Sequence, residues 1–89
     1  MQSKNIVPII STSKLAETRA FYVDQLGMQI SFDHSQYLGV RTGDAGAPEL
    51  GFMVPDTEWP DEFGGKGLAI GISVADADKE CDRLRAAGI

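Results

Sequence analysis

The feature that most constrains this chain is an order of segments that occurs twice. A short apolar run is followed by a helix-like stretch and then by a glycine, first at Gly27 and again at Gly88, 61 residues further on. Such self-similarity indicates two copies of one structural unit. The chain is therefore expected to hold one complete unit and the beginning of a second.

The first unit contains a strand, a helix and a meander. The β-branched run 6–10 predicts a strand, and Pro8 within it favours an edge position. From 14 to 26 apolar residues recur about every fourth position, which predicts a helix with an N-cap at Thr12 or Ser13 and a C-terminus at Gly27. Three short runs separated by turn residues then predict an antiparallel meander: 28–32, 37–41 and 49–54, with turns at 33–35 and 43–48.

The second unit is expected to repeat the first strand and helix. Residues 56–67 are rich in glycine and proline and predict a linker. The run 68–74 predicts a strand, and a helix should start near Asp76 with Cys81 on its inward stripe. In the first helix, the spacing predicts that Phe21, Tyr22 and Leu26 anchor it to the sheet.

Charge and cysteine content exclude several kinds of partner. The chain of 89 residues is short enough for one domain, and its net charge is −5 without a basic stretch, which argues against nucleic acid and against an anionic membrane surface. Its one cysteine cannot form an intramolecular disulfide, and no charged and apolar leader precedes the first strand. A cytoplasmic location is expected.

Several segments resemble the glyoxalase / bleomycin-resistance / extradiol-dioxygenase superfamily, also called vicinal oxygen chelate proteins. They are Ser13–Tyr22 with Gln25–Met28, Glu49–Pro55, and Val74–Asp76 with Leu84–Ile89. The resemblance implies an α+β fold: a βαβββ module plus the start of a second module, with a mixed curved sheet and helices on its convex face. It divides the single domain 1–89 into a first module 4–55, a linker 56–67 and a partial second module 68–89.

Domains of this superfamily continue for three further strands, so the resemblance implies that the domain is C-terminally incomplete. The strand edges left without neighbours make pairing with another chain plausible, and a homodimer is expected.

The resemblance also implies where a metal would bind. Enzymes of the superfamily hold a divalent metal with ligands from the first and fourth strands of each module. These positions fall on Val7 and Ala69, whose side chains cannot ligate, and on or next to Glu49. Since one carboxylate is not a metal site, neither a metal nor another cofactor is expected.

Aromatic and sulfur-bearing side chains in the meander and linker are the candidate ligand contacts. Alternation places Glu49, Gly51 and Met53 on one face of a strand, with Gly51 leaving room for a ligand. Such side chains suit a planar or partly apolar small molecule, although any one of them would more commonly serve in the core. The predicted set is Phe32, Tyr37, Glu49, Met53 and Trp59.

Three other features carry no functional prediction. His34 lies between Asp33 and Ser35 and is expected in an exposed turn. Cys81 is expected on the inward stripe of its helix, where a cysteine behaves as a small apolar group, so a structural role is expected. Residues 64–67 resemble a phosphate-binding loop only superficially, because no Ser or Thr follows Lys66 and a strand rather than a helix is expected next.

The residues leave three functions open. The first is metal-independent sequestration of a small molecule in an aromatic-lined groove. The second is a metal-dependent lyase, isomerase or dioxygenase, with Glu49 as one ligand and the others supplied by further strands or a partner chain. The third is an interaction module without a small ligand, its concave face filled by a strand of another chain.

Overall fold

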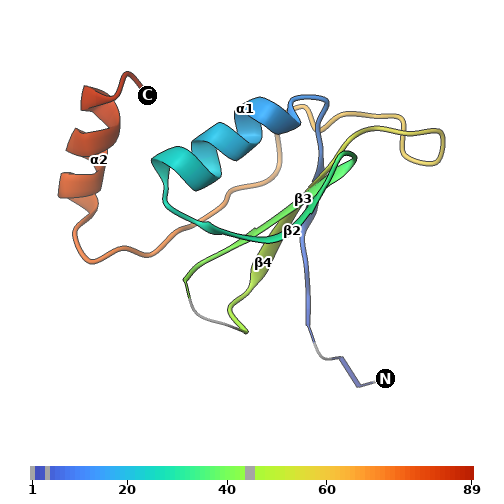
Figure 1. Ribbon diagram of the computed structural model, residues 1–89, viewed down its shortest axis with the longest axis horizontal. Helices are drawn as coiled ribbons and strands as arrows, with labels where there is room; N and C mark the ends of the chain where they lie inside the picture. The colour runs from blue at the N-terminus through green and yellow to red at the C-terminus, as the bar shows by residue number, and fades with distance from the viewer. Residues whose placement is uncertain (1, 4, 44–45) are drawn as a thin grey trace.

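The computed structural model describes residues 2–3, 5–43 and 46–89, and its centre is a curled sheet of four strands in the order β1-β4-β3-β2 (Figure 1). The strands are β1 (Ile9–Ser11), β2 (Gln29–His34), β3 (Tyr37–Arg41) and β4 (Glu49–Met53). β1 pairs with β4 in parallel, whereas β2, β3 and β4 pair antiparallel. The mixed sheet and the meander are confirmed; the proposed module start at residue 4 and residues 44–45 of the 43–48 turn lie outside the described residues.

The first helix packs against one face of the sheet. It begins as α1 (Leu15–Arg19) and continues as the wider η1 (Ala20–Gln25), with Gly27 beyond its end at a φ of 73°. The predicted cap at Thr12 or Ser13 is wrong, because the N-cap position is Lys14 and no side chain caps it. Instead, the Thr12 hydroxyl accepts a hydrogen bond from the Lys14 amide at 3.1 Å.

The core lies between this helix and the sheet. Leu38, Val40 and Phe52 are 1%, 0% and 3% exposed, because alternation directs all three toward the helix. Around them pack side chains of β1, β4, the helix and its end: Ile10, Leu50, Leu15, Tyr22, Val23 and Met28. Leu50 and Phe52 thus face the helix, on the side of β4 opposite to Glu49, Gly51 and Met53.

Only one of the three predicted helix anchors lies in this core. Tyr22 packs on Phe52 with ring centroids 5.0 Å apart, whereas Phe21 and Leu26 line a hollow beside the helix. The reason is that η1 has more residues per turn than an α-helix, so residues beyond Ala20 leave the 3.6-residue spacing on which the prediction relied.

The second unit is present as a helix without its strand. α2 (Ala77–Ala86) begins where predicted, since the Asp76 carboxylate accepts a hydrogen bond from the Lys79 amide at 3.0 Å, and Gly88 follows its end at a φ of 85°. Residues 68–74 form no strand, which corrects the prediction. Among the described residues no backbone hydrogen bond involves this segment, and a strand exists only where a neighbour supplies such bonds.

α2 lies beside η1 and does not cover the sheet (Figure 1). Its residues are exposed apart from the half-buried Glu80 and Leu84. Cys81 is exposed, so the expectation that it lies on a buried stripe is wrong. Of the helices that the structure describes, none is long and apolar enough to cross a membrane.

Candidate functional site: the open face of the sheet

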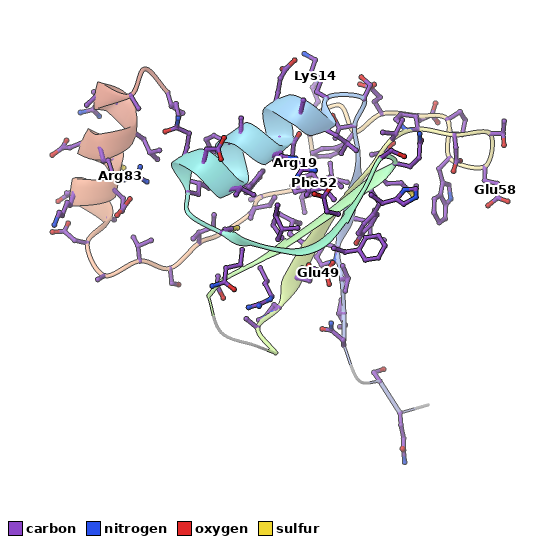
Figure 2. The ribbon with its side chains drawn as sticks, viewed as in Figure 1. Lys14, Arg19, Glu49, Phe52, Glu58 and Arg83 are labelled. Carbon is purple, nitrogen blue, oxygen red and sulfur yellow. The ribbon has the colours of Figure 1, made fainter. Side chains whose placement is uncertain are left out.

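The face of the sheet opposite the helix, called here the open face, carries polar and aromatic side chains. Figure 2 shows Glu49 on this side and Phe52 on the side of the helix. The pairing register of the strands defines the residues of the open face: Ile9 and Ser11 on β1, Gln29, Phe32 and His34 on β2, Tyr37, Gly39 and Arg41 on β3, and Glu49, Gly51 and Met53 on β4.

Phe32 belongs to the open face because of an irregularity in β2. Ile30 pairs with Val40 and Phe32 with Gly39, so Ser31 is an extra residue without a partner on β3. Strict alternation would place Phe32 on the same face as Ile30, but a bulge re-aims the residues that follow it. Phe32 therefore contacts Tyr37, with ring centroids 5.7 Å apart at 69°, and is 55% exposed.

His34 joins this aromatic group, which the sequence did not reveal. It is the last residue of β2 and not a turn residue, and its ring stacks on Phe32 at a centroid distance of 6.5 Å. Its Nδ1 accepts a hydrogen bond from the Gln36 amide at 3.2 Å, which leaves Nε2 available for a ligand. The signal in the sequence is the spacing Phe32-Asp33-His34, since residues two apart share a face.

Two paired glycines form the centre of the open face. Gly39 and Gly51 lie opposite one another on β3 and β4. A Cβ at Gly51 would collide with the Tyr37 hydroxyl, and a Cβ at Gly39 would collide with the Glu49 carboxylate and lie 2.7 Å from the Ser31 hydroxyl. Tyr37 and Glu49 thus rest across the glycines.

The contact between Tyr37 and Glu49 has an electrostatic consequence. Partial burial raises the pKa of the Tyr37 phenol, and the negative charge of Glu49 and its hydrogen bond to the phenol raise that pKa further. The phenol therefore remains protonated near neutral pH and can donate a hydrogen bond to the carboxylate or to a ligand that displaces it.

Trp59 extends this surface beyond the sheet. The indole is 60% exposed and lines a pocket of 450 Å³ together with Ile9, Ser11 and Met53. Met53 lies opposite Tyr37 in the strand pairing, so it connects the pocket to the aromatic group. The structure thus brings Phe32, Tyr37, Glu49, Met53 and Trp59 onto one continuous surface; whether a ligand binds there stays a prediction.

An ion pair fixes the position of the strand that carries Phe32 and His34. The Arg19 guanidinium on α1 donates two hydrogen bonds to the Asp33 carboxylate, one of them 2.9 Å long. The hydrogen bond and charge of Arg19 hold the pKa of Asp33 below its ordinary value of 3.8. Both side chains are exposed, so the pair is expected to stabilise the fold only modestly.

The residues do not fit the metal site that the superfamily's enzymes carry. No three His, Cys, Asp or Glu side chains come together in the part of the chain that the structure describes. Alternation places Val7 on the same face as Ile9, and its side chain has no donor atom. Glu49 is the one carboxylate on the open face, and it contacts Tyr37.

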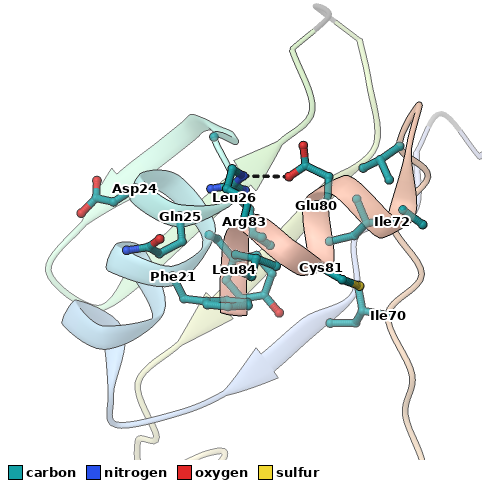
Figure 3. Close-up of a pocket in the computed structure, with 14 residues that line it drawn as sticks. Phe21, Asp24, Gln25, Leu26, Ile70, Ile72, Glu80, Cys81, Arg83 and Leu84 are labelled. Atoms are coloured by element: carbon teal, nitrogen blue, oxygen red, sulfur yellow. Dashed lines mark hydrogen bonds and ion pairs between the residues drawn. The ribbon is translucent and has the colours of Figure 1, made fainter. Parts of the chain in front are cut away.

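A second hollow, of 730 Å³, lies between η1, residues 70–74 and α2 (Figure 3). Its lining is mainly apolar, with Phe21, Leu26, Ile72 and Leu84 among the residues shown. Its ion pair joins two residues of α2, Arg83 and Glu80, at 2.9 Å. These charged groups satisfy one another, and Asp24 and Gln25 are further polar side chains of the lining.

The sequence of residues 6–89 matches the Glyoxalase/Bleomycin resistance protein/Dioxygenase superfamily, and the chain belongs to this superfamily. No curated protein is a significant match to the sequence.

Several solved structures are similar to the chain. The bleomycin-binding protein of bleomycin-producing Streptomyces verticillus, complexed with copper(II)-bleomycin, is 26% identical with a TM-score of 0.51 over 61% of this chain and 42% of that one. A glyoxalase/bleomycin resistance protein/dioxygenase from Nocardioides is 20% identical with a TM-score of 0.72, over 100% and 64% of the two chains. Lactoylglutathione lyase from Agrobacterium tumefaciens is 17% identical with a TM-score of 0.67, over 99% and 72%. The last two likenesses concern the fold alone.

Proposed function

We propose that this chain binds a small, planar, partly apolar molecule on the open face and acts by sequestering it, without a metal. The observation that carries the proposal is the continuous surface of Phe32, Tyr37, Met53 and Trp59. Phe32 and Trp59 are 55% and 60% exposed, and large apolar groups that gather on an exposed surface commonly mark a binding site. The Streptomyces verticillus relative, which is complexed with copper(II)-bleomycin, supports a binding role.

The lack of side chains at Gly39 and Gly51 gives the proposal its geometry. A planar molecule that moves Tyr37 and Glu49 aside would lie against two residues without side chains, between the Phe32 ring and Met53. The displaced phenol and carboxylate would then supply one hydrogen-bond donor and one acceptor at the rim. This arrangement is suited to binding and orienting a ligand.

Fluorescence of the single tryptophan tests the proposal. Titration with metal-free bleomycin and with 2-naphthol should change Trp59 emission. Tyr37→Ala or Met53→Ala should weaken binding about tenfold for each 1.4 kcal/mol of binding free energy that the replaced side chain contributes. The control is Ile30→Ala, on the same strand as Phe32 but on the opposite face. Affinity that survives both site substitutions would exclude the open face as the binding surface.

Metal independence has its own test. A specific ligand stabilises the native state by mass action, so a bound divalent metal would raise the unfolding temperature. We expect Mg²⁺, Mn²⁺, Zn²⁺ and Ni²⁺ to leave this temperature unchanged. A stoichiometric stabilisation that EDTA reverses would instead favour the second candidate, a metal-dependent lyase, isomerase or dioxygenase. That candidate is supported by the Glu49 carboxylate on the open face and would take its other ligands from further strands or a partner chain.

We also propose that the chain is a homodimer in the cytoplasm. β1 and β2 form the edges of the sheet, and unpaired edges favour association with a second chain. The single cysteine suits a reducing compartment. A monomer mass that does not change with concentration in sedimentation would refute the dimer, and fractionation of the source cells would test the location.

A further inference from the structure

The pocket beside Trp59 differs in chemistry from the rest of the open face. Its volume is 450 Å³, and it lies between the end of β1, Met53 and the loop 58–61. Ile9 and Met53 supply its apolar walls, whereas the loop supplies Glu58, Trp59 and Asp61. Every residue that lines it is neutral or acidic, so the pocket combines an indole ring with two carboxylates and no basic group.

Hydrogen bonds hold this loop in a defined shape. The Asp56 carboxylate accepts hydrogen bonds from the amides of Glu58 and Trp59 at 2.9 and 2.8 Å, and the Asp56 amide donates to the Trp59 carbonyl at 3.0 Å. These bonds close a turn and so fix the backbone positions from which the side chains of Trp59 and Glu58 extend. The carboxylates of Glu58 and Asp61 are left free, since none of the ion pairs among the described residues includes them.

The far end of the loop is fastened to β1. The Phe63 amide donates to the Ser11 carbonyl at 2.9 Å, and the Ser13 amide donates to Glu62 Oε1 at 3.1 Å. The loop therefore stays beside the strand, with Trp59 next to Met53. Ser11 is one of the lining residues, and its hydroxyl oxygen is buried and has no hydrogen-bond partner among the described residues. A buried hydroxyl without a partner is costly unless something satisfies it.

We propose that this pocket takes the ammonium group of a small organic cation. The face of an indole attracts a cation, and the two free carboxylates would neutralise its charge. The net charge of −5 would attract the same class of molecule from a distance. The proposal rests on the proposed function and adds to it the charge of the ligand that the open face binds.

A bare metal ion fits the pocket less well than an organic cation. Hard divalent ions require several converging oxygen ligands, and no group of three acidic, histidine or cysteine side chains that could hold one is found in the described part of the chain. The indole and the walls from Ile9 and Met53 instead suit the methylene or methyl groups around an ammonium nitrogen.

Choline and its uncharged isostere 3,3-dimethyl-1-butanol test the proposal on the wild-type chain. Their shapes match, so a difference in affinity reports the positive charge. The indole Nε1–H signal of Trp59, the single tryptophan, reports binding directly. Choline should shift this signal and bind about tenfold more tightly than the alcohol, which corresponds to ~1.4 kcal/mol. Equal affinities, or no shift with either compound, would overturn the proposal.

A charge-matched pair of variants separates the pocket from the general field of the protein. Glu58→Gln with Asp61→Asn should lower choline affinity about tenfold, whereas Asp24→Asn with Asp78→Asn, which removes the same charge away from the pocket, should leave it within about twofold. Equal effects of the two double variants would overturn the proposal. Binding of 2-naphthol distinguishes failure of the cation site from failure of the proposed function. If 2-naphthol binds the open face but choline binds no more tightly than 3,3-dimethyl-1-butanol, only the cation site is refuted. If choline binds more tightly than the alcohol but 2-naphthol does not bind, only the planar-ligand site is refuted.

Discussion

Replacement of Phe52 should destabilise the chain far more than replacement of Phe21. Phe52 is 3% exposed and contacts Tyr22, and it shares the core with Leu38 and Val40. Truncation of a fully buried phenylalanine to alanine costs about 3–5 kcal/mol, from the transfer free energy of the removed ring and from the cavity left behind. Phe21 lies outside this core and contacts Tyr22 edge-on at 5.1 Å, an interaction worth roughly 0.5–1.5 kcal/mol.

Urea unfolding followed by circular dichroism measures the difference. Since stabilities of small domains are typically only about 5–15 kcal/mol, Phe52→Ala is expected to lose much of its folded population. Phe52→Leu keeps most of the apolar volume and provides a milder variant, with an expected loss of about 1–2 kcal/mol. In a thermal scan, each ~1 kcal/mol should lower the unfolding temperature by roughly 4–8 °C.

The comparison also tests the effect of the π-helical turn. If Phe21→Ala cost as much as Phe52→Ala, then Phe21 would be a core residue, and the regular helical spacing expected from the sequence would hold after all. A loss from Phe21→Ala that is less than half of the loss from Phe52→Ala supports the placement of Phe21 outside the core.

Two further predictions concern electrostatics and helix capping. Arg19 lowers the pKa of Asp33, so this ion pair should stabilise the fold above about pH 3.8 and lose its effect as the pH falls through the lowered pKa. Asp33→Asn should therefore lower the urea midpoint near pH 7, and the difference from wild type should shrink progressively as the pH falls below 3.8. Asp76→Ala removes the hydrogen bond to Lys79 at the start of α2 and should cost about 1 kcal/mol of helix stability, seen as faster amide exchange confined to α2, with Asp82→Ala as the control.

The sequence correctly predicted those elements in which the local residue preferences and the packing in the fold favour the same structure. β3 and β4 alternate between core residues such as Val40 and Phe52 and open-face residues such as Tyr37, and the sheet has this pattern. The end of η1 and the start of α2 were also predictable, because Gly27 takes a positive φ and Asp76 caps a helix.

The predictions that failed have a common physical cause: the structure of these segments depends on contacts with other parts of the chain. Residues 68–74 have the composition of a strand but no partner for their backbone groups among the described residues. The extra residue Ser31 moves the side chains that follow it to the other face of the sheet, and the wide turn of η1 rotates side chains around the helix axis. Neither change has a sequence signature. For this reason the sequence did not indicate that His34 and Gly39 join the open face, whereas Gly51 was expected there from alternation along its strand.

The unpaired segment 68–74 has a consequence for handling the protein. Leu68, Ile70, Ile72 and Val74 are 41–48% exposed, and between them stand the small residues Ala69, Gly71 and Ser73. Seven consecutive residues without charge or proline, rich in β-branched side chains, have the composition of segments that stack into amyloid-like fibrils. At high concentration this chain should therefore form aggregates that bind thioflavin T over time. The substitution Ile72→Lys should suppress this aggregation, because a charge interrupts the apolar segment.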